Sequence, residues 1–225
     1  MGVEMKKSFL VGLLVVLCLV GLVLTITAGP QAEKPKMMGQ MQMKMQPTRS
    51  MCELRAAMRK LWEDHIVWTR CYIVSALAKL EDGNAAAQRL LANQDDIGNA
   101  IKPFYGDGAG KKLAGLLHDH IVIATEVVKA AMTNVGLPEA QKKWTDNADA
   151  IAVFLSGANS HWAKADLVDM LYKHLALTTD EVVSRLKKDW GADIAAYDKN
   201  HAHMLSFSDI LTRGIVMQFP DKFKE

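Results

Sequence analysis

From residue 50 onward, apolar residues recur every three or four positions, which is the spacing of one face of an α-helix. The first such stripe contains Leu54, Met58, Leu61, Trp68 and Tyr72. No segment alternates between apolar and polar residues with a period of two, so strands are not expected. The pattern predicts an all-α fold, a helical bundle of about six helices, over about residues 50–80, 84–102, 110–133, 138–157, 164–187 and 190–216.

Local signals indicate where some of these helices begin and end. Ser50, followed three residues later by Glu53, fits a capping box in which each side chain binds the backbone N–H of the other residue. Pro103 is expected to end the second helix, because an interior proline removes a hydrogen bond. Three glycines at 106, 108 and 110 then predict a loop between the second and third helices.

The chain repeats itself three times with a period of about 54 residues. The matched segments are LWEDHIV at 61–67, LLHDHIV at 116–122 and MLYKHLA at 170–176. They align His65, His120 and His174, which are 55 and 54 positions apart. One helical hairpin cannot bury its apolar face alone. We therefore predict that the bundle is built from three repeated helical hairpins packed together.

Asparagines recur with the same period on the other helix of each hairpin. They are Asn93, Asn147 and Asn200. Counted from turns near residues 107 and 160, Asn93 lies at the height of His120 and Asn147 at the height of His174, and Asn200 would reach His65 if the last helix closes on the first. A buried imidazole needs hydrogen-bond partners, and an amide both donates and accepts. The interpretation is three structural polar pairs, each joining one hairpin to the next.

A second interpretation of the same histidines is a metal site. Imidazole is a ligand for zinc and copper. His65, His120, His174 and His203 could share an ion only if the three hairpins wrap around a common axis. If the hairpins stack linearly, the histidines are ~10 Å or more apart. The sequence leaves both arrangements open.

The first 28 residues have the pattern of an export signal. Lys6 and Lys7 precede an uncharged apolar run over residues 9–28. This run fits a cleaved signal peptide or an N-terminal membrane anchor. Both place the remaining chain outside the cytoplasm, whether secreted, periplasmic or anchored at the outer face of the cytoplasmic membrane. Contact with a membrane is expected only if the segment is uncleaved.

Residues 29–49 predict a disordered, methionine-rich linker before the domain over residues 50–225, because they show no apolar periodicity. Five methionines lie within nine positions of this linker. They are Met37, Met38, Met41, Met43 and Met45. Thioethers are soft ligands that select Cu(I). The possible cofactors are therefore copper, here, or copper or zinc at the histidines, and the alternative is a spacer whose methionines bind nothing.

Composition and motifs restrict the function further. Lys and Arg total 27 against 25 Asp and Glu, so no basic field is available to hold nucleic acid. The chain contains no Glu-x-x-His pair, no phosphate-binding loop and no Gly-x-Ser-x-Gly. We expect an extracytoplasmic binding or interaction protein, with a protein partner or a second copy as a possible partner. The alternatives are a metal-dependent enzyme that uses the repeated histidines and a purely structural envelope protein.

Four motifs resemble a family of exported bacterial proteins of uncharacterised function. They are LWEDHIVWTR at 61–70, NQDDIGNAIKP at 93–103, NAD at 147–149 and QFP at 218–220. The likeness covers about residues 52–223 and implies an extracytoplasmic helical protein without an established active site. Some members carry a glycosyltransferase label, which the residues here do not support, since no nucleotide-sugar fold is indicated. The methionine-rich linker is not part of the family pattern.

Overall fold

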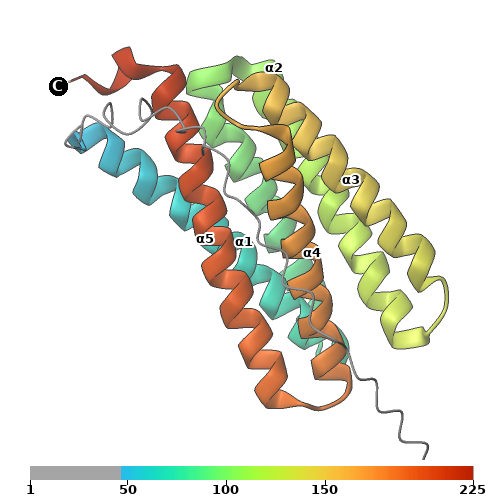
Figure 1. Ribbon diagram of the computed structural model, residues 1–225. Coiled ribbons are helices and arrows are strands. Elements are labelled where there is room, and N and C mark those ends of the chain that lie inside the picture. Colours follow the sequence, from blue (N-terminus) through green and yellow to red (C-terminus); the bar gives the residue numbers. More distant parts are fainter. Residues whose placement is uncertain (1–46, 225) are drawn as a thin grey trace, which may run out of the picture. The chain divides into compact units, whose positions relative to one another are not determined.

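The computed structural model describes residues 47–224, which contain five α-helices, a short 3-10 helix and no strand (Figure 1). The prediction of an all-α fold is confirmed. The elements are α1 (Arg49–Ala78), α2 (Gly83–Thr133), α3 (Leu137–Ala158), α4 (Lys164–Leu186), α5 (Trp190–Gln218) and η2 (Pro220–Phe223).

The five helices form a closed ring. Helix α1 packs against α2, α2 against α3, α3 against α4 and α4 against α5, and α5 packs back on α1. In Figure 1, α4 lies between α5 on one side and α3 on the other. Because α5 returns to α1, the helices surround a common interior and are not stacked in a line.

The second and third predicted helices both lie within α2 and meet at a kink at Gly106, inside the predicted break. The chain turns back there, since His118 and Asp95, on opposite sides of the kink, lie 3.3 Å apart. The loop expected over residues 106–110 is absent. Only Gly106 leaves the helical conformation, with φ 80° and ψ 169°. A positive φ is unstrained for glycine, so a single residue can redirect the chain while its neighbours stay helical. Pro103 lies inside α2 rather than at its end. The direction changes at the glycine, not at the proline.

The capping box expected at the start of α1 is also wrong. Thr48 caps the helix, and its hydroxyl accepts a hydrogen bond from the Met51 N–H at 3.3 Å. The helix therefore starts before Ser50, and Glu53 binds Arg49 at 2.7 Å instead of reaching back to a cap. Both Thr and Ser can cap a helix, and the sequence pattern does not decide between neighbours.

Two separate groups of buried apolar side chains fill the interior. The larger one, the main core, includes Met58, Trp62, Ile97, Ile151 and Phe207. The smaller one, the apolar end cluster, consists of Ile73, Val128 and Val182. These three residues lie eight positions after His65, His120 and His174, which is about two helical turns further along α1, α2 and α4. A polar layer at the level of these three histidines therefore separates the two groups of apolar side chains.

Within residues 47–224, no helix is both long and apolar enough to cross a membrane. The expected signal or anchor at residues 1–28 lies outside the described residues, and so does the linker up to residue 46.

Candidate functional site

The three repeated histidines lie together in the middle of the bundle. The ring centroids of His65 and His174 are 5.6 Å apart, those of His120 and His174 5.9 Å, and those of His65 and His120 6.4 Å. Each residue is at most 3% exposed. The rings come from α1, α2 and α4, so the closed ring of helices brings all three to one point.

Each imidazole is held by an amide from the helix that follows it. His120 Nδ1 lies 2.9 Å from Asn147 Oδ1, and His174 Nδ1 lies 2.9 Å from Asn200 Oδ1. His65 Nδ1 lies 3.3 Å from Gln94 Nε2. The expectation of structural histidine–amide contacts is correct in kind, but the partners differ from those expected.

The expected pairs, Asn93 with His120, Asn147 with His174 and Asn200 with His65, are wrong. Each histidine instead contacts an amide on the helix that follows its own along the chain, over sequence separations of 29, 27 and 26 residues. The count from the turns fails because it compares only the heights of the residues along the bundle. The direction of the side chains around each helix, which the count ignores, decides the partner.

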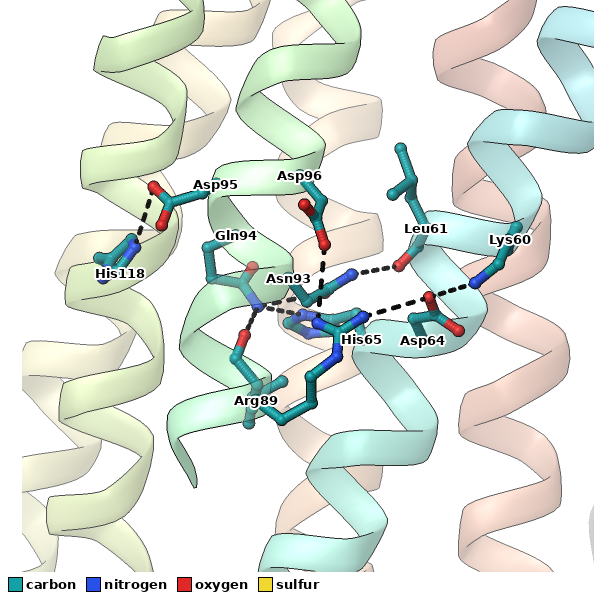
Figure 2. Close-up of polar contacts among 11 residues, drawn as sticks. Lys60, Leu61, Asp64, His65, Arg89, Asn93, Gln94, Asp95, Asp96 and His118 are labelled. Atoms are coloured by element: carbon teal, nitrogen blue, oxygen red, sulfur yellow. Dashed lines mark hydrogen bonds and ion pairs between the residues drawn. The ribbon is translucent and has the colours of Figure 1, made fainter. Parts of the chain in front are cut away.

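His65 differs from His120 and His174 because its amide partner is a glutamine, Gln94, and not an asparagine (Figure 2). Asn93 Nδ2 donates to the Leu61 carbonyl at 3.0 Å, as Asn147 Nδ2 donates to the Leu116 carbonyl at 3.0 Å. Asn93 Oδ1, however, accepts from Gln94 Nε2 at 3.2 Å, and it is Gln94 that contacts His65. Gln94 is fully buried, and sequence reasoning did not single it out.

A cavity in which the centre of a water molecule can move through about 20 Å³ borders the three rings. We call this cavity the three-histidine chamber. Its walls extend from the histidines through Thr69, Ala124 and Thr178 to the apolar end cluster, with Trp144 at one side. This volume is enough for one ordered water. The chamber is the layer that separates the main core from the apolar end cluster.

The chamber keeps its imidazoles uncharged. Burial lowers the pKa of His120 to about 3 and that of His174 to about 4, because the imidazolium form loses its hydration. Burial, reinforced by the other two rings, also holds the pKa of His65 well below 6.5. All three rings are therefore neutral near pH 7 and keep a lone pair.

Several polar atoms at the chamber have no partner within residues 47–224. The three Nε2 atoms make no hydrogen bond to the described residues, and neither does the buried Nε1 of Trp144, whose ring centroid lies 5.3 Å from that of His120. Buried polar groups in native proteins are usually satisfied. Their accumulation here marks the chamber as the candidate site.

The fourth expected metal ligand, His203, does not reach the chamber. It is half-buried, and its Nε2 contacts the Met170 carbonyl at 2.8 Å. Across the part of the chain that the structure describes, no group of three or more His, Cys, Asp or Glu side chains is arranged to hold a metal ion. The five linker methionines, residues 37–45, lie outside the described residues.

A second buried polar group, which sequence reasoning missed, joins α1, α4 and α5. The guanidinium of Arg70 binds Glu181 at 2.8 Å and both carboxylate oxygens of Asp193, one of them at 2.9 Å. Arg185 also binds Asp193 at 2.9 Å. We call these four residues the buried ion cluster. Glu181 lies seven positions after His174 and Asp193 seven before Asn200, so their place on the inner helix faces was a usable signal.

Burial and pairing act in opposite directions on the two carboxyl groups of the buried ion cluster. Burial raises the pKa of Glu181, and the Arg70 guanidinium only partly offsets this. Burial also acts to raise the pKa of Asp193, but hydrogen bonds from Arg70 and Arg185 outweigh it and hold that pKa below 3.8. The charges of the cluster balance, which suits a structural connection between helices.

No family model matches the chain, and no similar curated protein or solved structure is found.

Proposed function

We propose that this chain is an extracytoplasmic binding protein whose ligand site is the three-histidine chamber. The observation that carries the proposal is a set of three buried, neutral imidazoles around a cavity, with all three Nε2 atoms unused by the described residues. Small-molecule sites are typically apolar cavities with a few converging polar groups. The chamber shares the apolar lining, since valine, isoleucine and alanine side chains make up much of its wall. Its free space of about 20 Å³ holds one water, so a larger ligand requires the lining side chains to move apart.

The chemistry of the chamber favours binding over catalysis. Its lining residues include no carboxylate and no thiol within residues 47–224. The hydroxyls of Thr69 and Thr178 donate to the backbone carbonyls of His65 and His174, so neither is free to act as a nucleophile. Imidazoles with pKa values of about 3 and 4 are weak bases at pH 7.

The extracytoplasmic location is part of the proposal and is supported by Lys6, Lys7 and the apolar run over residues 9–28. The intact mass of exported protein tests it. A mass that begins at Gly29 supports a cleaved signal, and a full-length mass in the membrane fraction supports an anchor. Protein that remains in the cytoplasm contradicts the location.

We also infer that the bundle is built from three copies of one hairpin, with α2 supplying the second helix of the first copy and the first helix of the second. Support comes from the three histidine–amide contacts, each made within one such unit. It also comes from Asn93 and Asn147, which both donate to the carbonyl four residues before the histidine of their own hairpin. On this basis the chamber lies where the three units meet.

Copper or zinc association stays a prediction for the methionines of residues 37–45. Elemental analysis of purified protein with and without residues 29–49 tests it. Stoichiometric copper that disappears with the deletion supports binding in the linker. Equal metal content in both forms contradicts it.

The chamber itself is tested by filling it. Ala124 lines the chamber, so Ala124→Leu should occupy the space, while Ala85→Leu adds the same side chain at an exposed position of α2. Native mass spectrometry of the exported protein should show a bound small molecule in the wild type and in Ala85→Leu. The same mass should be absent from Ala124→Leu. Equal occupancy in all three forms, or a bare polypeptide in all three, contradicts a ligand site in the chamber and favours the structural alternative.

A further inference from the structure

A groove lies on the surface of the bundle along the seam between α4 and α5, which pack side by side (Figure 1). We call it the α4–α5 groove. Its volume is about 520 Å³, and it shares no lining residue with the three-histidine chamber. Leu177, Val183 and Ala196 are buried or half-buried and form an apolar floor. The groove is therefore a separate feature, which the proposed function does not use.

Three lysines line the α4–α5 groove. Lys173 and Lys187 come from α4 and its C-cap, and Lys199 comes from α5. All three are exposed, and their ammonium groups make no hydrogen bond or ion pair with another residue of 47–224. Asp180 is the one carboxylate among the lining residues, so three positive charges against one negative charge give a net charge of +2. The lysines therefore have charge left to pair with a group from outside the described chain.

The preceding hairpin has a groove in the corresponding place, between the second part of α2 and α3, with a volume of about 300 Å³. We call it the α2–α3 groove. Its charges are balanced, because Lys129 and Lys143 are matched by Glu126 and Glu139. Lys143 Nζ lies 3.7 Å from Glu126 Oε2 and 3.9 Å from Glu139 Oε1, so this groove pairs its charges internally. It provides a comparison within the same molecule.

The two grooves differ in volume and in charge because corresponding positions hold different residues. Positions are counted from the histidine–asparagine contact of each hairpin. On this count α3 has Glu139, Lys142, Lys143 and Asp146 where α5 has Ala192, Ala195, Ala196 and Lys199. The short alanine side chains leave the wider groove, and Lys199 reverses the charge of Asp146. On the other helix of the hairpin, Lys173 reverses the charge of Asp119.

The spacing of the lysines and the apolar floor restrict the class of ligand. Ammonium groups pair with carboxylates and other anions. Lys173 and Lys187 are 14 positions apart, which is ~21 Å along α4, so a compact anion such as phosphate cannot contact both. Leu177 and Val183 in the floor favour a ligand with apolar side chains over a uniformly polar polyanion. A helix with an apolar face flanked by carboxylates meets both requirements, and helices commonly dock in grooves in this way.

We infer that the α4–α5 groove docks an acidic amphipathic helix of a partner protein, whose carboxylates pair with Lys173, Lys187 and Lys199. The apolar face of the partner helix lies on the floor, where the alanines of α5 allow close approach. This interaction surface is additional to the chamber and does not depend on the chamber binding a ligand.

A designed peptide tests the groove. The probe is a fluorescein-labelled helical peptide of about 14 residues, with leucines on one face and glutamates on both flanks, and its control has lysines in place of the glutamates. Fluorescence anisotropy with the purified exported protein should show the acidic peptide binding at least tenfold more tightly than the basic one. Its affinity should fall as the NaCl concentration is raised, because salt screens exposed charges. Equal binding of both peptides, or no binding of the acidic peptide, overturns the inference.

Two double variants show whether the lysines of the groove are responsible. Lys173→Asp with Lys199→Asp gives these positions the acids of the preceding hairpin and should weaken binding of the acidic peptide at least tenfold. Lys142→Asp with Lys143→Asp changes the net charge by the same amount on α3 and should leave the affinity unchanged. All four lysines are exposed, so thermal unfolding should show that both proteins stay folded. Equal loss of affinity in both would indicate overall charge rather than the groove, and would overturn the inference.

The floor of the groove and the class of partner have their own tests. Ala195→Leu adds bulk to the groove without a change in charge and should weaken peptide binding at least fivefold, whereas Ala150→Leu, at an exposed position of α3, should not. Heparin and phosphatidylglycerol vesicles represent a polyanionic polysaccharide and an anionic membrane. If either binds more tightly than the peptide, and loses this affinity in Lys173→Asp with Lys199→Asp, the assignment of a helical partner is overturned.

Discussion

The rings of His65 and His174 lie 5.6 Å apart, although α2 and α3 separate the two residues in the chain. Both rings are buried and neutral, and each is held by an amide from its own hairpin. Two imidazoles can lie this close in a protein interior because neither carries a charge. Because the rings are this close, a positive charge on His174 lowers the pKa of His65 further.

Stability should therefore fall as the pH is lowered from 7 to 5. Unfolded histidines titrate near 6.5, whereas the folded pKa values are about 3 for His120 and about 4 for His174, with His65 also well below 6.5. Below pH 6.5 the unfolded chain binds protons that the folded chain does not. Well below pH 6.5, each ring lowers the free energy of unfolding by about 1.4 kcal/mol per pH unit, and near pH 6.5 by about half of that. Urea denaturation at pH 7, 6 and 5 measures the combined slope, which should be about 2 kcal/mol per unit between pH 7 and 6 and approach about 4 kcal/mol per unit between pH 6 and 5.

The variant His120→Gln provides the comparison for this slope. It removes one of the three titrating rings and leaves the carboxylates unchanged, so its slope should be about two thirds of the wild-type value. A slope equal to that of the wild type would show that the chamber histidines do not titrate as their burial requires.

Removal of a chamber amide should cost stability. Asn147→Ala leaves His120 Nδ1 without an acceptor in a buried position, which costs about 1–3 kcal/mol. Asn99→Ala, at an exposed position of α2, should change the free energy of unfolding by less than about 0.5 kcal/mol. Urea denaturation of both variants at pH 7 gives the two values, and similar values would contradict a specific role for Asn147.

Arg70 should contribute more to the free energy of unfolding than any single surface charge. Arg70→Leu leaves Glu181 without its ion-pair partner and Asp193 with Arg185 alone, at an expected cost of about 3–5 kcal/mol at pH 7. Lys142→Ala breaks an exposed pair with Asp146 and should cost less than about 1 kcal/mol.

The loss in Arg70→Leu should also depend on pH. Burial raises the pKa of Glu181 in the folded state, and removal of Arg70 takes away the group that opposes this rise. The folded variant therefore binds a proton more readily than the unfolded chain, and its deficit relative to the wild type should shrink as the pH falls toward 5. Thermal unfolding of both proteins across this range measures the trend, and a deficit independent of pH would contradict it.

Substitution by alanine should have opposite effects on stability at two glycines. A Cβ at Gly214 would lie 1.9 Å from Trp162 Nε1, so Gly214→Ala forces the indole or α5 to move and should cost about 1–3 kcal/mol. Gly115, in the helical part of α2, has open space around its Cβ position, and Gly115→Ala should stabilise by about 0.5–1 kcal/mol. Differential scanning calorimetry should show melting temperatures shifted in opposite directions, and a stabilising Gly214→Ala would contradict the packing.

The sequence was sufficient for the helices after Gly136, because these follow from apolar periodicity. Repetition aligned His65, His120 and His174 but left a ring and a linear stack of hairpins both open, so it did not decide whether the three rings meet. It was not sufficient for the amide partners, because rotation around each helix axis depends on packing rather than on spacing. Gln94 was missed for the same reason, since it occupies a position next to the repeated Asn93. The buried ion cluster was missed because apolar periodicity does not mark charged residues as buried, although Glu181 and Asp193 lie on inner helix faces.

The exposed residue Gly106 has a consequence for the distant interior. His120 follows it by 14 residues, which is ~21 Å of helix, so a small change of direction at this glycine becomes a large displacement at the His120 ring. A side chain here would disfavour the positive φ, and a swing of only ~20° would carry the His120 ring ~7 Å sideways, more than its spacing from the other two rings. The geometry of the protein's centre is thus set in part by one backbone torsion at its surface.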